Sequence, residues 1–340
     1  MNLRTLMLGT AMSLLAVPGF AADAPVALVV AQGGLGDGSW NDTANAGFTA
    51  GIEATGLEGR AIESNDVVAQ GEEIMRRAAD AGFGLVLSLE YAHGDTMAKL
   101  APDYPETDWA IFNQVQPGDN IASVMFGEHQ GSFLAGVLAA QMTTTEGVEG
   151  INPQPILGVI AAVKSPGIDK FVVGFIQGAK SVNPDVQVQV GYAETFGDPT
   201  KGEQMADAMF EAGADIIYHV AGGTGLGVIS AAESTGHYAI GVDTNQDGLA
   251  PGHVLTSMVK RVDVATEQLI KDYAEDKFPG GQTLVFGLPE NGVGLTDMEY
   301  TKDIIPAAYL EKVEAAKAAI IAGEIKVWDV STQGYPDFYQ

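Results

Sequence analysis

Side chains that could bind a flat polar molecule recur directly after apolar runs that are typical of buried strands. The first such run, residues 26–30, is followed by the glycine-rich segment Ala31–Phe48, which contains Asp37, Trp40 and Asn41. Glycines let the backbone turn sharply and approach a ligand closely, and tryptophan offers an extended aromatic face. An aromatic residue beside a turn is, however, often part of the core. From this segment alone, a packing role and a binding role for Trp40 both stay open.

Comparable side chains follow the other expected strands. Because parallel strands bring their carboxyl ends to one edge of a sheet, ligands bind at that edge in open α/β folds. Two lobes that face each other would therefore share one cleft. Aromatic faces, amides and an ionic pair of Asp243 with Lys260 would suit a flat heterocycle that carries a polyol. The residues expected at this cleft are Asp37, Trp40, Asn41, Tyr91, Asn113, Phe196, Gly222, Asp243 and Lys260.

The most enzyme-like segment is Ala221–Gly227, which is rich in glycine and is followed about twenty residues later by Asp243, as in dinucleotide-binding units. Val228 stands where that fingerprint needs its last glycine, so exposed backbone facing a ligand is the favoured interpretation. The five histidines lack the spacing of zinc ligands, and no G-x-S-x-G nucleophile motif is present. We therefore expect no catalytic residues, no metal site and no cofactor.

Composition and charge exclude several classes of function. The chain of 340 residues has 44 acidic and 17 basic residues, a net charge of −27, and no cysteine. Such a surface repels nucleic acid and anionic lipid, and disulfides or lipid attachment through cysteine are excluded. A charged start at Arg4, an apolar stretch 6–17 and small residues near Ala22 are typical of a cleavable signal peptide. We expect an exported, periplasmic protein with no direct membrane insertion.

Apolar strand-like runs alternate with helix-length segments along almost the whole chain, which predicts parallel sheets covered by helices. Ten strands are expected, at 26–30, 60–63, 85–89, 109–112, 121–126, 156–162, 186–192, 216–220, 238–242 and 254–259. Amphipathic or capped helices are expected near 41–54, 70–81, 94–101, 167–182, 200–212, 226–234 and 307–321. Ten strands are too many for one small sheet, so we expect two doubly wound lobes. The segment Gly147–Pro155, between the two halves, is predicted to be a surface loop.

Five segments give the sequence a specific resemblance. They are GGLGDGSWNDTANAGF, GEHQGSFLAGVLA, ADIIYHVAGGTGLGV, AIGVDTNQD and LTSMVKRVDVA, and the similarity runs in order from Val26 to about Trp328. The chain resembles the basic membrane protein family, the group of ABC-transporter substrate-binding proteins similar to purine nucleoside receptor A. This resemblance implies an α/β type I periplasmic-binding-protein fold, with two doubly wound parallel-sheet lobes joined by three crossovers.

The resemblance also implies a division of the chain. The signal peptide would occupy residues 1–22, the N-terminal lobe residues 23–127 plus 258–282, and the C-terminal lobe residues 128–257 plus 283–340. The lobes would close by a hinge motion at the crossovers, near 114–127, 244–255 and 278–284.

By the same resemblance, the ligand would be a purine nucleoside or nucleobase that is passed to the permease subunits of an ABC importer. Trp40 and Phe196 would sandwich the base, Asn41 and Asn113 would contact its edge, and Asp243 with Lys260 would hold the ribose hydroxyls, while Gly222 would contribute backbone. The family usually has Phe at position 40 and often Asp at position 113, and the amide of Asn113 puts the identity of the base in question. The alternatives are another planar ligand such as riboflavin and, less favoured, a nucleoside-processing or dinucleotide-dependent enzyme.

Overall fold

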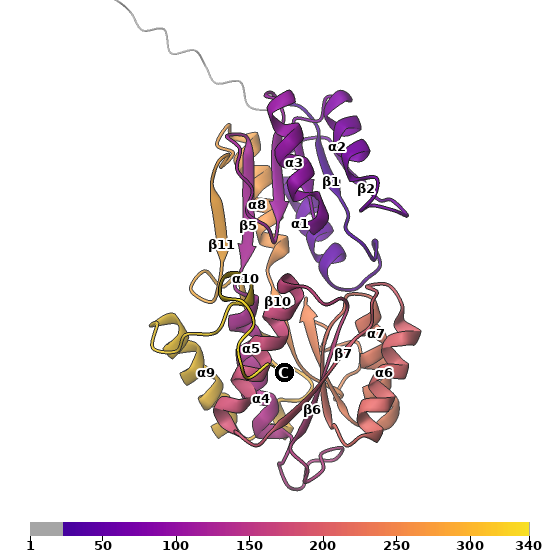
Figure 1. Ribbon diagram of the computed structural model, residues 1–340, viewed down its shortest axis with the longest axis vertical. Helices are drawn as coiled ribbons and strands as arrows, with labels where there is room; N and C mark the ends of the chain where they lie inside the picture. The colour runs from indigo at the N-terminus through magenta and orange to yellow at the C-terminus, as the bar shows by residue number, and fades with distance from the viewer. Residues whose placement is uncertain (1–22, 340) are drawn as a thin grey trace, which may run out of the picture.

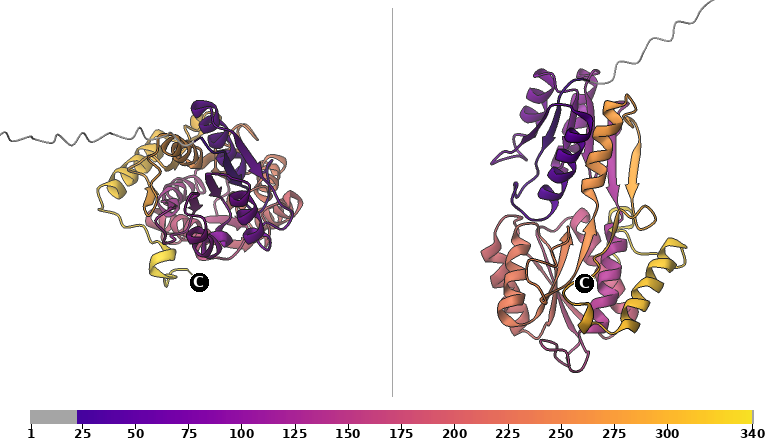
Figure 2. Two further views of the ribbon diagram at one scale, coloured as in Figure 1. Left: turned by 90° about the horizontal axis from the view of Figure 1, so that it is seen from above. Right: turned by 180° about the vertical axis from the view of Figure 1, so that it is seen from behind.

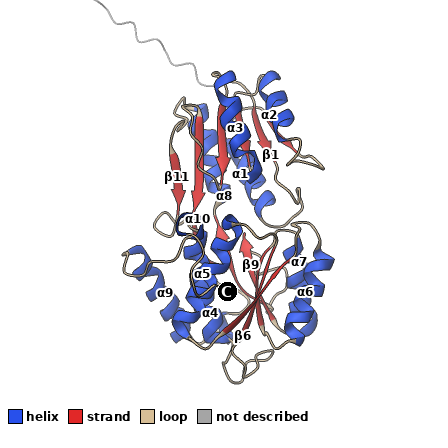
Figure 3. Ribbon diagram, in the orientation of Figure 1, coloured by secondary structure: helices blue, strands red, loops and turns tan. Residues whose placement is uncertain are grey.

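The computed structural model describes residues 23–339 and consists of two α/β lobes, one above the other in Figure 1. The signal peptide expected at residues 1–22 lies outside the described residues. Each lobe contains a six-stranded sheet with helices on both faces (Figure 3). The expected two doubly wound lobes are therefore confirmed, and the ten expected strands are all present within one residue of their predicted bounds.

The N-terminal lobe is built on a parallel sheet with the strand order β11-β5-β4-β3-β1-β2. Successive side chains of a strand point to opposite faces, and β1 shows this directly. Val26 and Leu28 pack with α1 and α8, whereas Ala27 and Val29 pack with α2 and α3. The elements are β1 (Val26–Val29), α1 (Trp40–Thr55), β2 (Gly59–Ile62), α2 (Gly71–Asp80), β3 (Leu85–Ser88), α3 (Gly94–Leu100), β4 (Asp108–Phe112), β5 (Ile121–Phe126), α8 (Val262–Ala274) and β11 (Thr283–Phe286).

The C-terminal lobe has the strand order β12-β10-β9-β8-β6-β7, in which only β12 is antiparallel to its neighbour. Helices α4 and α5 cover one face of this sheet, and α6 and α7 cover the other. The elements are α4 (Glu128–Met142), β6 (Ile156–Ala161), α5 (Pro166–Val182), β7 (Gln187–Tyr192), α6 (Pro199–Glu211), β8 (Ile216–Val220), α7 (Thr224–Thr235), β9 (Tyr238–Asp243), β10 (Val254–Lys260), β12 (Val293–Leu295), α9 (Ala307–Ile321) and α10 (Val330–Gln333).

Figure 2 shows the two lobes from above and from behind. The chain crosses between them at Gly127, at Arg261 and in the loop 287–292. The predicted lobe boundaries at 258 and 282 are therefore wrong by a few residues. Residues 258–260 pair with β9 and β12 in the C-terminal sheet, and β11 pairs with β5 in the N-terminal sheet. For the same reason the hinges expected at 244–255 and 278–284 lie within single lobes. The loop Gly147–Pro155 joins α4 to β6 and belongs to the C-terminal lobe.

Helices α4 and α5 lie unusually close together because small residues face each other where they cross. A Cβ atom on Gly136 would lie 2.1 Å from the carbonyl oxygen of Phe175, and one on Gly178 would lie 2.0 Å from that of Phe133. Any larger residue at either position would push the helices apart. This close packing matters for the site because Glu128 and Lys170 lie near the N-terminal ends of α4 and α5.

Candidate ligand-binding site

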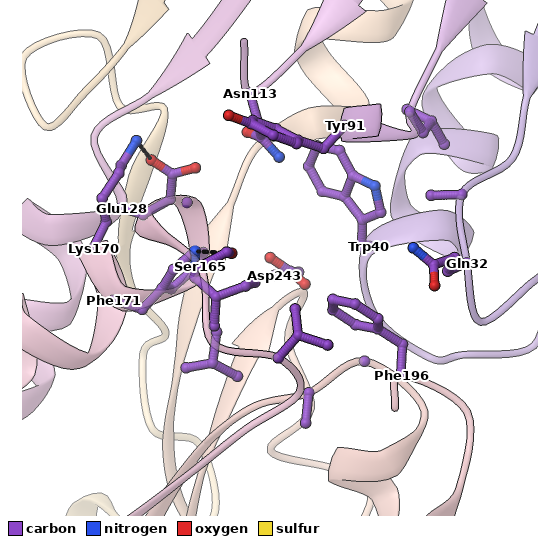
Figure 4. Close-up of a pocket in the computed structure, with 18 of the residues that line it drawn as sticks. Gln32, Trp40, Tyr91, Asn113, Glu128, Ser165, Lys170, Phe171, Phe196 and Asp243 are labelled. Atoms are coloured by element: carbon purple, nitrogen blue, oxygen red, sulfur yellow. Dashed lines mark hydrogen bonds and ion pairs between the residues drawn. The ribbon is translucent and has the colours of Figure 1, made fainter. Parts of the chain in front are cut away.

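A cavity of about 470 Å³ lies between the lobes, at the carboxyl ends of the strands of both sheets. This volume is within the range of small-molecule sites. Figure 4 shows side chains from both lobes pointing into it. Eight of the nine residues predicted for the cleft line this one cavity, namely Asp37, Trp40, Tyr91, Asn113, Phe196, Gly222, Asp243 and Lys260.

Asn41 is the predicted site residue that the structure places elsewhere. Its side chain is fully buried and is not part of the cavity lining. Its Oδ1 accepts a hydrogen bond from the amide of Ala31 at 2.9 Å, and its Nδ2 donates to the carbonyl oxygen of Gln32 at 3.3 Å. Both ends of the amide thus hold the loop that follows β1. The expected contact of Asn41 with the edge of a base is not supported by this position.

Asp37 lines the cavity, but its oxygens are used within its own loop. They accept hydrogen bonds from the amides of Ser39, Asn41 and Asp42 at 2.9, 3.0 and 3.1 Å. These amides belong to the start of α1, where helix N–H groups lack partners within the helix. Burial raises the pKa of Asp37 above its usual value, and the three backbone donors act against that rise. Asp37 therefore shapes the loop that presents Trp40.

A buried ion cluster forms the charged side of the cavity. Glu128, the first residue of α4, pairs through Oε2 with Lys170 at 2.7 Å and through Oε1 with Lys260 at 2.9 Å, and all three side chains are at most 4% exposed. Burial alone would raise the pKa of Glu128, but the two ammonium groups lower it to about 2. The carboxylate thus stays ionised at neutral pH and balances one of the two cations. Of the three members of this cluster, only Lys260 is predicted for the cleft from the sequence.

Lys260 also fixes two other residues of the cavity. Its Nζ donates to Asn113 Oδ1 at 3.0 Å and lies 4.2 Å from the centre of the Trp40 ring, which is a cation–π distance. An ammonium group can only donate, so Asn113 must turn its oxygen toward Lys260 and its NH₂ group away. Within residues 23–339 the expected ionic pair of Lys260 with Asp243 is not formed, because Lys260 pairs with Glu128 instead.

Asp243 ends β9 and is one of four carboxylates in the cavity lining, with Asp37, Glu90 and Glu128. Its Oδ2 accepts a hydrogen bond from Ser39 Oγ of the N-terminal lobe at 2.7 Å. Burial raises the pKa of Asp243 to about 6, against the opposing effects of nearby Lys260 and of the Ser39 hydroxyl. Asp243 and Asn113 both adopt left-handed backbone conformations, with φ of 67° and 63°. Such conformations are uncommon outside glycine and concentrate at functional sites.

The aromatic side chains of the cavity come from both lobes. Trp40 packs its edges against Phe112 and Phe126, with ring centres 6.1 and 6.2 Å apart. Phe196, in the loop before α6, approaches from the C-terminal lobe (Figure 4). Tyr91 stands at the rim, 51% exposed. The two lobes therefore offer aromatic surface to the same cavity.

Gly222 begins the turn before α7 and has a left-handed φ of 54°. A Cβ atom there would lie 3.3 Å from the carbonyl oxygen of Phe196. That carbonyl accepts a hydrogen bond from the amide of Thr224 at 3.1 Å. The glycine-rich turn therefore packs closely against the loop that carries Phe196, which accounts for its composition without a phosphate-binding role.

Direct hydrogen bonds join the lobes around the cavity. Besides the Ser39–Asp243 bond, Gln246 Nε2 donates to the carbonyl oxygen of Gly38 at 2.9 Å. Gln246 is itself held by His219, whose Nε2 lies 2.8 Å from Gln246 Oε1. Burial lowers the pKa of His219 to about 4, so this histidine is neutral at physiological pH. It acts as a packed structural residue.

Within residues 23–339, no group of three or more acidic or histidine side chains is arranged to hold a metal ion, and no helix has the length and hydropathy of a membrane span.

Comparisons with known proteins agree with this architecture. Residues 24–331 match the family model described as Bmp, ABC transporter substrate-binding protein PnrA-like. The chain is 33% identical to the CD4+ T-cell-stimulating antigen of Listeria monocytogenes, over 90% of this chain and 88% of that protein. It is 29% identical to the ABC transporter nucleoside-binding protein BmpA of Lactococcus lactis, over 90% and 89%.

A solved structure, that of an ABC transporter system solute-binding protein from Aeropyrum pernix, superposes with a TM-score of 0.82 at 27% identity and covers 90% of this chain and 93% of that one. Proteins of this kind act outside the cytoplasm, and they bind a solute rather than convert it. The matched family model and the two-lobe fold lead to one conclusion. The chain belongs to the Bmp family of PnrA-like ABC-transporter substrate-binding proteins.

Proposed function

We propose that this protein captures a purine nucleoside in the periplasm and delivers it to the permease of an ABC importer. The observation that carries the proposal is the combination, in one cavity, of aromatic surface from Trp40 and Phe196 with the carboxylate of Asp243 and the amide of Asn113. A nucleoside needs this combination, because its base is flat and apolar on both faces whereas its sugar is a polyol. The name of the Lactococcus lactis relative agrees with it.

The proposed roles follow the geometry of the cavity. Trp40 and Phe196 stack on the base, and Asp243 accepts hydrogen bonds from ribose hydroxyls through the lone pairs that Ser39 leaves free. Lys260 positions Asn113 and Trp40 while its remaining N–H bond is available to the ligand. Tyr91 and Gly222 bound the cavity at its rim and through backbone. Because these groups come from both lobes, a ligand satisfies them all only when the lobes are together.

A thermal-shift screen tests the proposal directly. Purified mature protein is heated with nucleosides, nucleobases and flavins, and a ligand that binds the folded state raises the melting temperature. Calorimetry then gives the stoichiometry, and chromatography shows whether the nucleoside is recovered unchanged. We expect one purine nucleoside per chain and no product. A shift with riboflavin and none with nucleosides would instead establish the planar-ligand alternative, and turnover would establish an enzyme.

Replacing Trp40 with alanine should lower the affinity for every purine ligand to a similar extent, by about tenfold or more. An aromatic pair contributes about 0.5–1.5 kcal/mol beyond the area it buries, and 1.4 kcal/mol corresponds to about tenfold in affinity. Calorimetric titration of several purines against the variant measures the effect. Trp40→Phe is the matched control, since it keeps a stacking face and should lose much less. A variant that loses affinity for only one of these purines would contradict a stacking role.

Replacing Asn113 with aspartate should change which base is preferred. Lys260 holds Oδ1 of Asn113, so the wild-type side chain directs a hydrogen-bond donor toward the cavity, whereas aspartate would direct an acceptor. Inosine and adenosine differ in a ring-edge carbonyl and amino group. We expect the dissociation constant of adenosine, divided by that of inosine, to fall about tenfold in the variant. Asn65→Asp adds the same charge at an exposed position and should leave the ratio unchanged. An identical ratio in Asn113→Asp would remove Asn113 from the base-binding edge.

A further inference from the structure

The C-terminal segment Trp328–Tyr339 returns to the start of α5, beside the ligand cavity. Figure 1 shows this segment, in yellow, running from α9 to α10 and on to the C-terminus in front of the C-terminal lobe. The amide of Trp328 donates to Gln177 Oε1 of α5 at 2.8 Å, and α10 packs on α5. The match to the family ends at residue 331. Most of the contacts described next therefore lie beyond the region that the family shares.

A buried carboxylate holds the segment in place. Asp169, in the first turn of α5, is fully buried and accepts hydrogen bonds from the hydroxyls of Tyr335 and Tyr192, each at 2.6 Å. The hydroxyls of Tyr192 and Tyr339 are hydrogen-bonded to each other. The rings of Tyr335 and Tyr339 stack with their centres 5.4 Å apart. Lys164 completes the cluster, with Nζ 5.7 Å from the ring centres of both Tyr192 and Tyr339.

The start of α5 is also one wall of the cavity. Ser165, Ile168, Lys170 and Phe171 all line it, and Lys170 is the residue that follows Asp169. Lys170 in turn pairs with Glu128, which holds Lys260. Ser331, from the C-terminal segment, lines the same cavity. The tyrosine cluster therefore holds the first turn of α5 from outside the cavity, and neighbouring residues of the same helix line the cavity.

We propose that Trp328–Tyr339 is a strap that fixes the first turn of α5, and that Tyr335 and Tyr339 are positioning residues for ligand binding. They act through Asp169 and do not touch the ligand. When the Asp169 carboxylate loses a hydroxyl donor, the free-energy cost of removing it from water is no longer offset by that hydrogen bond. The first turn of α5 then moves toward water to lower this cost. That movement displaces Lys170 and Phe171, and the cavity wall moves with them.

The test compares Tyr335→Phe and the double variant Tyr335→Phe/Tyr339→Phe with wild type by amide hydrogen exchange without ligand. Exchange in peptides covering 163–172 should be roughly tenfold faster in the variants, the equivalent of one lost hydrogen bond to a charged group. Tyr238→Phe is the matched control, because its hydroxyl donates to the carbonyl oxygen of Glu149 at 2.9 Å and lies outside the cavity lining. It should leave these peptides unchanged.

The second measurement is the rate at which bound inosine dissociates, which should rise several-fold in Tyr335→Phe and not in Tyr238→Phe. This part rests on the proposed nucleoside ligand, whereas the exchange measurement does not. If wild-type protein binds no nucleoside, the proposed function fails. The exchange result alone then decides whether the strap fixes the first turn of α5. Unchanged exchange at 163–172, or a rise spread evenly over the C-terminal lobe, would overturn the strap. Faster exchange with an unchanged dissociation rate would overturn its role in ligand binding.

Discussion

Replacing Glu128 with glutamine is expected to lower the free energy of unfolding by about 3–5 kcal/mol, the range for removing one partner of a buried ion pair. The variant leaves Lys170 and Lys260 buried within the protein with no carboxylate between them. Urea denaturation at neutral pH measures the change. Glu72→Gln is the matched control, because its pair with Arg76 is exposed on α2 and should be worth less than about 1 kcal/mol.

The dependence of this effect on pH follows from the lowered pKa of Glu128. Because the pKa in the folded protein is about 2, below the ordinary glutamate value of about 4.3, the ionised carboxylate stabilises the fold fully above that ordinary value. The contribution is lost as the pH falls toward 2. The difference in stability between wild type and Glu128→Gln should therefore narrow below about pH 4. Equal stability of the two proteins at neutral pH would show that the cluster is not formed.

Asp243→Ala should lower the affinity for a purine nucleoside by about 100-fold or more and leave the fold intact. Two hydrogen bonds to a charged acceptor contribute about 1.5–3 kcal/mol each, and 1.4 kcal/mol is about tenfold. The variant also removes the acceptor of the Ser39 hydroxyl, which joins the lobes. Calorimetry measures the affinity, and circular dichroism checks the fold.

Two comparisons sharpen the Asp243 prediction. Glu203→Ala removes an exposed carboxylate from α6 and should not change the affinity. Since burial raises the pKa of Asp243 to about 6, wild-type affinity should also fall as the pH is lowered through that value, and this fall should be absent in Asp243→Asn. Unchanged affinity in Asp243→Ala would place Asp243 outside the binding site.

Much of the fold could be predicted because strand composition and helix caps are local signals. The helix at 307–321 follows Pro306 and precedes Gly323, and the structure places α9 at those residues. Helix α4 was not predicted because thirteen of its fifteen residues are buried, so it lacks the one-sided apolar pattern of a surface helix. Strands β11 and β12 have four and three residues, and only Val293 among them is buried, so they lack the continuous buried apolar run that marks the strands inside each sheet.

The candidate site was predicted well where residues end strands and poorly where side chains meet across the molecule. The rule that ligands lie at strand ends also applies to Glu128, which follows β5 by two residues, yet an isolated glutamate gave no reason to select it. Lys170 lies inside a helix and had no such signal. Asn41 lies outside the cavity lining for a different reason, because its position in the first turn of α1 lets its amide reach back to the preceding loop.

The three buried charges have a mechanical consequence because of where they are attached. Glu128 follows the Gly127 crossover and Lys260 precedes the Arg261 crossover, so both sit beside the pivots about which the lobes would turn. Their elements, α4 and β10, and the helix α5 that carries Lys170 all belong to the C-terminal lobe. The cluster therefore moves with that lobe as one body and stays paired while the far edges of the lobes separate. Opening would instead have to break hydrogen bonds that cross between the lobes, such as those of Ser39, Gln246 and Asn113, while the buried ion pairs stay intact.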